Sequence, residues 1–154
     1  MNGFSENCLI SNNGTLKVAD FGFARSVDEN ELCTTYCGST VYAAPEILSA
    51  SAPYDPFLAD TWSCGIVLYI MFTAKMPFSR ENLNYFLRIK RVEGMTHSRI
   101  MTSSYFSVPR ISNTVSEIGI KLLHGILLFN PEQRYRLNKI AEKKHEWYTN
   151  NALH

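Results

Sequence analysis

Two short apolar runs with β-forming residues lie near the start of the chain, at residues 8–10 and 16–19. The polar stretch SNNG separates them, with Asn13 and Gly14 at its centre. Asn and Gly readily adopt the positive φ angles that a tight hairpin turn requires. The pattern therefore predicts an antiparallel β-hairpin, followed by an exposed polar loop at residues 26–36.

Helical patterns dominate the rest of the chain. Pro45 can open a short helix through Leu48, because proline is tolerated in the first helical turn. From about residue 58 to residue 74 apolar residues face every direction around the helix, which predicts a helix buried on all sides. An amphipathic helix is expected at about 81–93, and a short one at about 137–144.

Another helix is expected after the long Ser-rich connection at residues 95–112, and it should run through Leu128. Thr114 and Glu117 have the spacing of a capping box at its start. The stretch NPEQR, at residues 130–134, predicts a turn between this helix and the last one. The fold class is thus mainly α with a small N-terminal β-hairpin.

The composition is typical of a globular protein, with 45% hydrophobic and 19% charged residues. The 15 Lys and Arg residues nearly balance the 14 Asp and Glu residues, which leaves a formal net charge of +1. No basic stripe indicates a nucleic-acid-binding surface, and no global field attracts an anionic membrane. We therefore expect neither nucleic acid nor membrane as a partner.

The apolar runs and the cysteines of the sequence bear on where the protein is located. The first residues have no basic region or apolar core of a signal peptide. The longest apolar run, at 64–72, is about half the ~20 residues of a membrane span. The chain is therefore expected to be soluble and cytoplasmic. No disulfide and no zinc site is expected of the four cysteines, which form no CxxC pair: Cys8, Cys33, Cys37 and Cys64.

The triplet Asp-Phe-Gly at residues 20–22 directly follows the second apolar run. A strand fixes the backbone there, Gly22 permits a sharp turn, and Asp20 can then reach a magnesium ion that bridges phosphates. Taken alone, the triplet could equally be an exposed aspartate at a strand end. Three further stretches follow in order: CGSTVYAAPEIL at 37–48, DTWSCGIVLY from Asp60, and NPEQR.

In order and spacing these four stretches resemble the C-terminal lobe of protein kinases, from about Glu6 to Trp147. The stretches DFGFAR and YCGSTVYAAPEIL look most like the testis-specific serine kinases of the calcium/calmodulin-dependent branch. The resemblance implies a partial kinase domain at 1–148, without the N-terminal lobe, and a tail at 149–154. It also implies transfer of the ATP γ-phosphate to Ser or Thr of a protein substrate.

Several site residues are implied by the resemblance. Asp20 and Asn7 would each hold a magnesium ion. Thr35 matches the activation-loop phosphosite, although the Arg that usually pairs with that phosphate is not supplied. Ser39 matches the position typical of Ser/Thr specificity.

Three more residues are implied to be structural. Glu46 would form a buried ion pair with Arg134 that pins the activation segment to the helices. Asp60 would accept backbone N–H bonds from the catalytic loop. For each of these charged residues the alternative is an ordinary surface position.

The catalytic residues of the family are not matched. Counting back from Asn7 places Asn2 at the position of the catalytic Asp and Phe4 at that of the Lys. Asn2 cannot take up a proton as a carboxylate does, and Phe4 cannot stabilise a phosphoryl charge. The sequence also contains no G-x-G-x-x-G and no V-A-I-K. We expect the chain alone to bind neither ATP nor magnesium and to phosphorylate nothing.

Two other readings stay open beside a truncated Ser/Thr kinase. The chain could be a non-catalytic module that binds a protein partner through its helices, or a fragment without function. In related kinases a helix that precedes the catalytic loop covers part of the helix at 58–74. We therefore expect an exposed apolar face and poor solubility when the chain is expressed alone.

Overall fold

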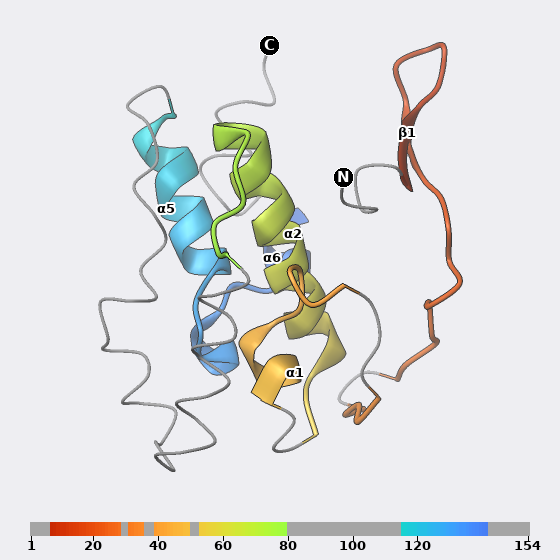
Figure 1. Ribbon diagram of the computed structural model, residues 1–154, viewed down its shortest axis with the longest axis vertical. Helices are drawn as coiled ribbons and strands as arrows, with labels where there is room; N and C mark the ends of the chain where they lie inside the picture. Colours follow the sequence, from red (N-terminus) through yellow and green to blue (C-terminus); the bar gives the residue numbers. More distant parts are fainter. Residues whose placement is uncertain (1–6, 29–30, 36–38, 50–52, 80–114, 142–154) are drawn as a thin grey trace.

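The computed structural model describes residues 7–28, 31–35, 39–49, 53–79 and 115–141. Within them, the chain is mainly helical, with one two-stranded antiparallel sheet near its start. Figure 1 shows the hairpin standing beside the helical body, at the end of an extended segment that leads to α1 (Pro45–Ser49). The predicted fold class is therefore confirmed.

The hairpin pairs β1 (Cys8–Ile10) with β2 (Leu16–Val18), and Leu9 lies opposite Lys17. Its turn closes through a hydrogen bond from the Gly14 amide to the Ser11 carbonyl, 2.8 Å long. Gly14 has φ +80°, a left-handed conformation that glycine adopts without steric cost. The Asn-Gly signal thus predicted this turn correctly.

The long helix α2 (Pro56–Thr73) forms the centre of the helical body. It starts two residues earlier than the sequence pattern predicted, because Asp55 caps it. One oxygen of the Asp55 carboxylate, Oδ1, accepts hydrogen bonds from the amides of Phe57 at 2.9 Å and Leu58 at 3.3 Å. Such a side chain replaces partners that the first amides of a helix lack.

Three elements near the C-terminus complete the described structure: α5 (Glu117–Ile126), the 3₁₀ turn η3 (Pro131–Gln133) and α6 (Leu137–Lys139). The turn lies where NPEQR predicted it, and the last helix begins at the expected residue. The predicted helix at 81–93 falls outside the described residues, as does the end of the predicted 137–144 helix.

The predicted capping box of α5 is wrong. The side chain of Ser116 caps the helix and accepts a hydrogen bond from the Gly119 amide at 3.2 Å. Glu117 is therefore the first helical residue, two positions before the third helical position that a capping box requires. Thr114 lies outside the described residues.

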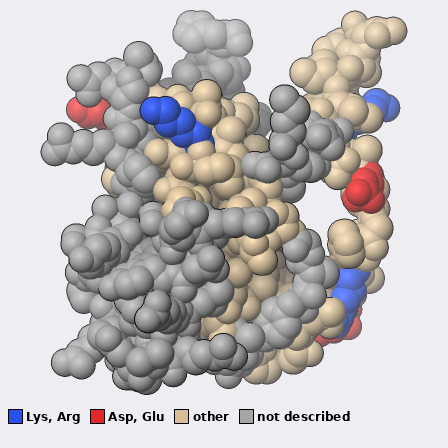
Figure 2. Space-filling model, viewed as in Figure 1, with Lys and Arg blue, Asp and Glu red and all other residues tan. Residues whose placement is uncertain are grey.

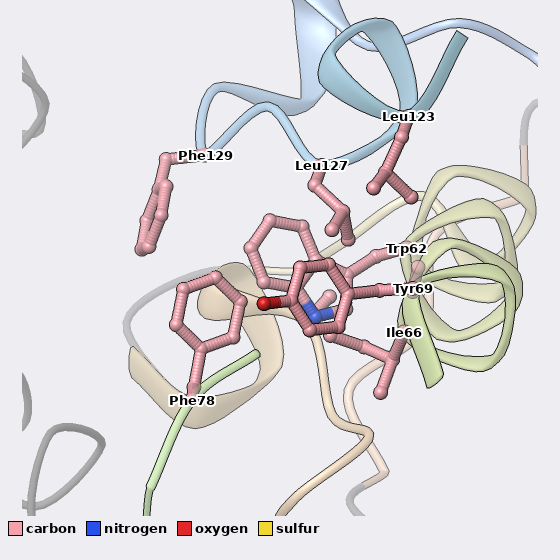
Figure 3. Packing of buried hydrophobic residues seen from close by; sticks show 9 residues of the cluster. Trp62, Ile66, Tyr69, Phe78, Leu123, Leu127 and Phe129 are labelled. Carbon is pink, nitrogen blue, oxygen red and sulfur yellow. The ribbon is translucent and has the colours of Figure 1, made fainter. Parts of the chain in front are cut away.

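The core lies where α2 faces α5 and the segments that follow these helices (Figure 3). The indole of Trp62 stacks on Phe78, with ring centroids 5.6 Å apart, and meets Phe129 edge-on at 5.2 Å. Ile66 and Leu123 are fully buried beside these rings. Offset and edge-on aromatic pairs add to the stabilisation that burial provides.

Helix α2 is not buried on every side, contrary to the sequence prediction. Its Trp62 face is buried, whereas Phe57 is 45% and Met71 76% exposed, and Cys64 between them is also exposed. An apolar pattern around the whole helix favours no face, so the neighbouring elements decide which face is covered. The other expectation from the sequence was that part of this helix would present an exposed apolar face, and α2 does present such a face.

Helix α2 also has the length and apolar composition of a membrane span, with a mean hydropathy of 1.3. Core helices of globular proteins have the same composition. Because Trp62, Ile66 and Tyr69 pack into the core, α2 does not indicate a membrane protein.

Candidate functional site

The end of the hairpin brings Asn7 and Asp20 together. The amide nitrogen Nδ2 of Asn7 lies 3.4 Å from the carboxylate oxygen Oδ2 of Asp20. The backbone amide of Ala19 also donates to the Asn7 carbonyl at 2.8 Å, which continues the strand pairing up to this site. The hairpin register therefore holds the two side chains side by side.

Asp20 has an unusual backbone conformation. Its φ is +61°, in the left-handed region that few residues other than Gly, Asn and Asp adopt. The other carboxylate oxygen, Oδ1, accepts a hydrogen bond from the Gly22 amide at 3.2 Å. The turn thus holds the Asp20 carboxylate next to Asn7 and leaves it exposed to solvent.

These groups suit a hard cation. Carboxylate and amide oxygens are the ligands that magnesium prefers, and magnesium is commonly held by one or two carboxylates plus substrate phosphates. The described residues contain no cluster of three or more His, Cys, Asp or Glu side chains that could form an all-protein metal site. Asn7 and Asp20 therefore do not by themselves form an all-protein metal site among the described residues.

The loop after Asp20 contains an ion pair that the sequence did not reveal. Arg25 pairs with Glu31, and the backbone amide of Asp28 donates to the same Glu31 carboxylate at 3.1 Å. The polar composition of this loop indicated exposure only. Without helical or strand periodicity, the positions of the charged residues in the sequence do not indicate which of them form ion pairs.

Thr35 and Ser39 are both exposed, and neither side chain contacts Asp20 or Asn7 in the described structure. The carbonyl of Thr35 accepts a hydrogen bond from the Tyr54 hydroxyl at 2.7 Å. The carbonyl of Ser39 accepts one from the Tyr42 amide at 3.1 Å. Both backbone positions are thus held while the side chains remain accessible.

Arg134 and Glu46 form an ion pair across the helical body, 88 residues apart in sequence. The two Arg134–Glu46 contacts, Nη1–Oε1 at 2.7 Å and Nη2–Oε2 at 3.0 Å, make the pair bidentate. Remaining donors of Arg134 reach the carbonyls of Leu58 at 2.6 Å and Leu128 at 3.0 Å. The guanidinium also lies 5.1 Å from the centre of the Trp62 ring. Four of the five N–H donors of this buried guanidinium thus have hydrogen-bond partners among the described residues.

Asp60 lies on the exposed face of α2, and no described residue donates a hydrogen bond to its carboxylate. Partial burial raises the pKa of the Asp60 carboxyl above its ordinary value. Desolvation, Asp60 and Cys8 together raise the pKa of the Cys64 thiol on the next turn. Of the residues matched to the catalytic loop, those that precede Asn7, including Asn2 and Phe4, fall outside the described residues.

A pocket of about 600 Å³ opens beside the Glu46–Arg134 pair, between α1, the start of α2 and η3. A second ion pair, Arg136 to Asp55 at 2.8 Å, lies in its wall. Sequence patterns gave no sign of this pocket, because its walls come from three segments distant in the sequence.

Among the described residues on the face shown in Figure 2, charged side chains are few, and Lys and Arg do not gather into one patch. Among the described cysteines, Cys8, Cys33 and Cys64 are free thiols.

Comparisons with known proteins support one family. The model of the protein kinase domain matches residues 5–148. A probable serine/threonine-protein kinase of Dictyostelium discoideum is 34% identical over 146 residues, which covers 95% of this chain and 16% of the relative. The Saccharomyces cerevisiae serine/threonine-protein kinase GIN4 is 35% identical over 137 residues, 89% of this chain and 11% of the relative.

The CBL-interacting protein kinase 8 of Oryza sativa subsp. japonica is 34% identical over 147 residues, which covers 95% of this chain and 29% of the relative. The chain thus spans less than a third of the length of these relatives. Because the kinase-domain model matches nearly all of its residues, the chain belongs to the protein kinase family.

Proposed function

We propose that this chain is the C-terminal lobe of a Ser/Thr protein kinase domain, which transfers the γ-phosphate of ATP to Ser or Thr of protein substrates. The observation that carries the proposal is the contact between Asn7 and Asp20 at the end of the hairpin, 3.4 Å apart. Two oxygen-bearing side chains held there suit a magnesium ion bridging the phosphates of ATP.

In this proposal the site residues that the structure describes have the following roles. Asn7 and Asp20 would hold magnesium ions, which would neutralise charge that develops on the phosphoryl group. Thr35 is the phosphorylation site of the activation segment, and Ser39 contacts the substrate residue. Glu46 and Arg134 anchor the end of that segment to the helical body.

The 154 residues supply no catalytic Asp, no Gly-rich loop and no V-A-I-K lysine. Groups that act as a unit leave little catalysis when several are missing. We therefore propose that the chain, tested alone, is inactive and that Mg-ATP leaves its melting temperature unchanged. Our placement near the testis-specific kinases rests on residues 20–25 and 36–48 and stays a prediction, as does a location in the cytoplasm.

A chimaera tests the proposal directly. The rice CBL-interacting protein kinase 8 would supply the domain up to its residue aligned with Asn7, and this chain would follow from residue 8. The chimaera should phosphorylate a protein substrate, and Asp20→Ala should lower the rate at least about a hundredfold, as expected for lost electrostatic stabilisation of the transition state. Glu132→Gln, an exposed change away from the site, is the matched control.

The second candidate function is a non-catalytic protein-interaction module. It is favoured by the ion pair and hydrogen bonds that hold Arg134, together with the exposed apolar face of α2. A well-folded chimaera that fails to phosphorylate, or one in which Asp20→Ala has no effect, would favour this module over the kinase proposal.

A further inference from the structure

Residues 31–35 lie alongside the segment that leads into α2. Cys33 and Tyr54 form an isolated antiparallel bridge, in which each backbone amide donates to the other's carbonyl at 2.9 Å. Cys33 is only 6% exposed, so the bridge is buried on this side. This pairing connects the middle of the loop after Asp20 to the body of the molecule.

The side chain of Tyr54 adds a third contact, two residues further along the loop. Its hydroxyl donates to the Thr35 carbonyl at 2.7 Å, a short hydrogen bond in which the donor and acceptor lie 19 residues apart in sequence. A tyrosine hydroxyl usually finds such a partner when its ring is half-buried. The ring itself packs against the hydrophobic core.

The backbone next to Tyr54 is held in place at the start of α2. The next residue, Asp55, caps α2 through Oδ1 and pairs with Arg136 through Oδ2 at 2.8 Å. Tyr54 therefore cannot move without disturbing the start of the central helix. By contrast, both Thr34 and Thr35 are exposed.

We propose that Tyr54 is a positioning residue, whose hydroxyl fixes the backbone at Thr35 to the start of α2 while the Thr35 side chain stays accessible for modification. This inference rests on the proposed function only in treating Thr35 as a phosphorylation site. The backbone bridge holds Cys33, and the hydroxyl, rather than the ring, sets the conformation of residues 34–35. A protein kinase that acts on Thr35 would meet a segment held in one conformation.

Hydrogen exchange of backbone amides tests this role. Tyr54→Phe removes the hydroxyl and keeps the ring, so it should speed exchange in peptides covering residues 31–35 about twofold to tenfold, as expected for one hydrogen bond. The melting temperature should fall by no more than about 5 °C. Tyr69→Phe is the matched control, because it removes a tyrosine hydroxyl in α2 that has no hydrogen bond to described residues. Fusion to a soluble carrier protein keeps every variant in solution.

A third variant, Tyr54→Leu, separates positioning from packing. It should speed exchange at residues 31–35 and lower the melting temperature clearly more than Tyr54→Phe does, because the ring packs against the core. The proposal is overturned if Tyr54→Phe leaves exchange at residues 31–35 unchanged, or speeds exchange equally in α2 and α5. Amide exchange needs neither ATP nor phosphorylation, so failure here is distinct from failure of the kinase chimaera.

Discussion

Arg134 connects several segments of the chain that are distant in sequence. Its guanidinium binds Glu46 from α1, the Leu58 carbonyl from α2 and the Leu128 carbonyl after α5. The side chain is completely buried, and that of Glu46 is 11% exposed. A buried charge of this kind costs desolvation energy, which only a full set of partners offsets.

Removing Arg134 should therefore be severe. Arg134→Met leaves the Glu46 carboxylate buried without a partner, and we expect a loss of roughly 3–5 kcal/mol in the free energy of unfolding. Urea unfolding measures it. Arg136→Met is the control, since its pair with Asp55 is partly exposed to solvent and should contribute less than about 1 kcal/mol. Equal losses in the two variants would contradict the prediction.

Asp60 predicts a dependence of stability on pH. Desolvation raises the pKa of the Asp60 carboxyl above its ordinary value of 3.8, so the folded state binds this proton more tightly than the unfolded state. Its contribution to the free energy of unfolding is present below 3.8 and is lost as the pH rises through the raised pKa. Asp60→Asn cannot ionise and should abolish that loss.

The measurement is urea unfolding of both proteins from about pH 3 to about pH 7. The difference in stability, Asp60→Asn minus wild type, should grow with pH. Glu132→Gln, which removes an exposed carboxylate, controls for the change in net charge. A difference that shrinks with pH would instead indicate that backbone amides donate to Asp60, as in the family resemblance.

At the scale of elements, the contact between α2 and α5 depends on a glycine. A Cβ placed on Gly65 would lie 2.4 Å from Cγ2 of Ile126 and 2.7 Å from Cδ2 of Leu127. Both distances are well inside van der Waals contact. The two helices can therefore approach this closely only because residue 65 has no side chain.

Gly65→Ala should destabilise the protein despite alanine's higher helix propensity. Overpacking costs about 1–3 kcal/mol, against about 1 kcal/mol gained in propensity, so we expect a net loss of roughly 1 kcal/mol. Thermal and urea unfolding measure this. Cys64→Ala, at the exposed neighbouring position, should stay within about 0.5 kcal/mol of wild type. A stabilised Gly65→Ala protein would show that the helices can separate freely.

The start of α5 shows where local patterns fail. Thr114 and Glu117 have the spacing of a capping box, but Ser116 also precedes the apolar run and can cap equally well. Ser and Thr have similar preferences for this position, so local sequence does not choose between them. Leu122 and Leu123 of this helix are buried in the core, a tertiary constraint that the local sequence at the helix start does not contain.

At the scale of the whole molecule, large apolar side chains remain in contact with solvent. Ile10 is 75%, Phe23 73% and Met71 76% exposed, and both hairpin strands expose their apolar residues. Apolar surface of this extent marks an interaction site or an aggregation liability. Figure 1 shows why the apolar residues of the hairpin are exposed: the hairpin stands beside the helices and does not pack on them.

We expect the chain expressed alone to aggregate and to bind a hydrophobic dye. The triple change Ile10→Thr, Leu16→Thr and Met71→Gln should lower dye fluorescence and increase the monomer fraction in size-exclusion chromatography, because it removes exposed apolar surface. Trp62→Phe, a change inside the core, should not improve solubility. Monomeric wild-type protein that binds no dye would show this expectation to be wrong.

The sequence alone determined what depends on short-range pattern and on motif order. The hairpin follows from two apolar runs around Asn13-Gly14, and the positions of α1, α2 and α6 follow from local periodicity and proline. The order of the four motifs predicted the kinase family, and with it the contact between Glu46 and Arg134, which the structure contains. Motif order carries this information because it reflects a complete fold.

Only the tertiary structure decided which contacts form between distant segments. An apolar pattern around all of α2 cannot say which face is buried, and neither Tyr54 nor Gly65 belongs to a motif. The Tyr54–Thr35 hydrogen bond, the close approach at Gly65 and the pocket beside Arg134 each need two or three segments in contact. Such contacts depend on how whole elements pack, and local sequence preferences are too weak to fix that packing.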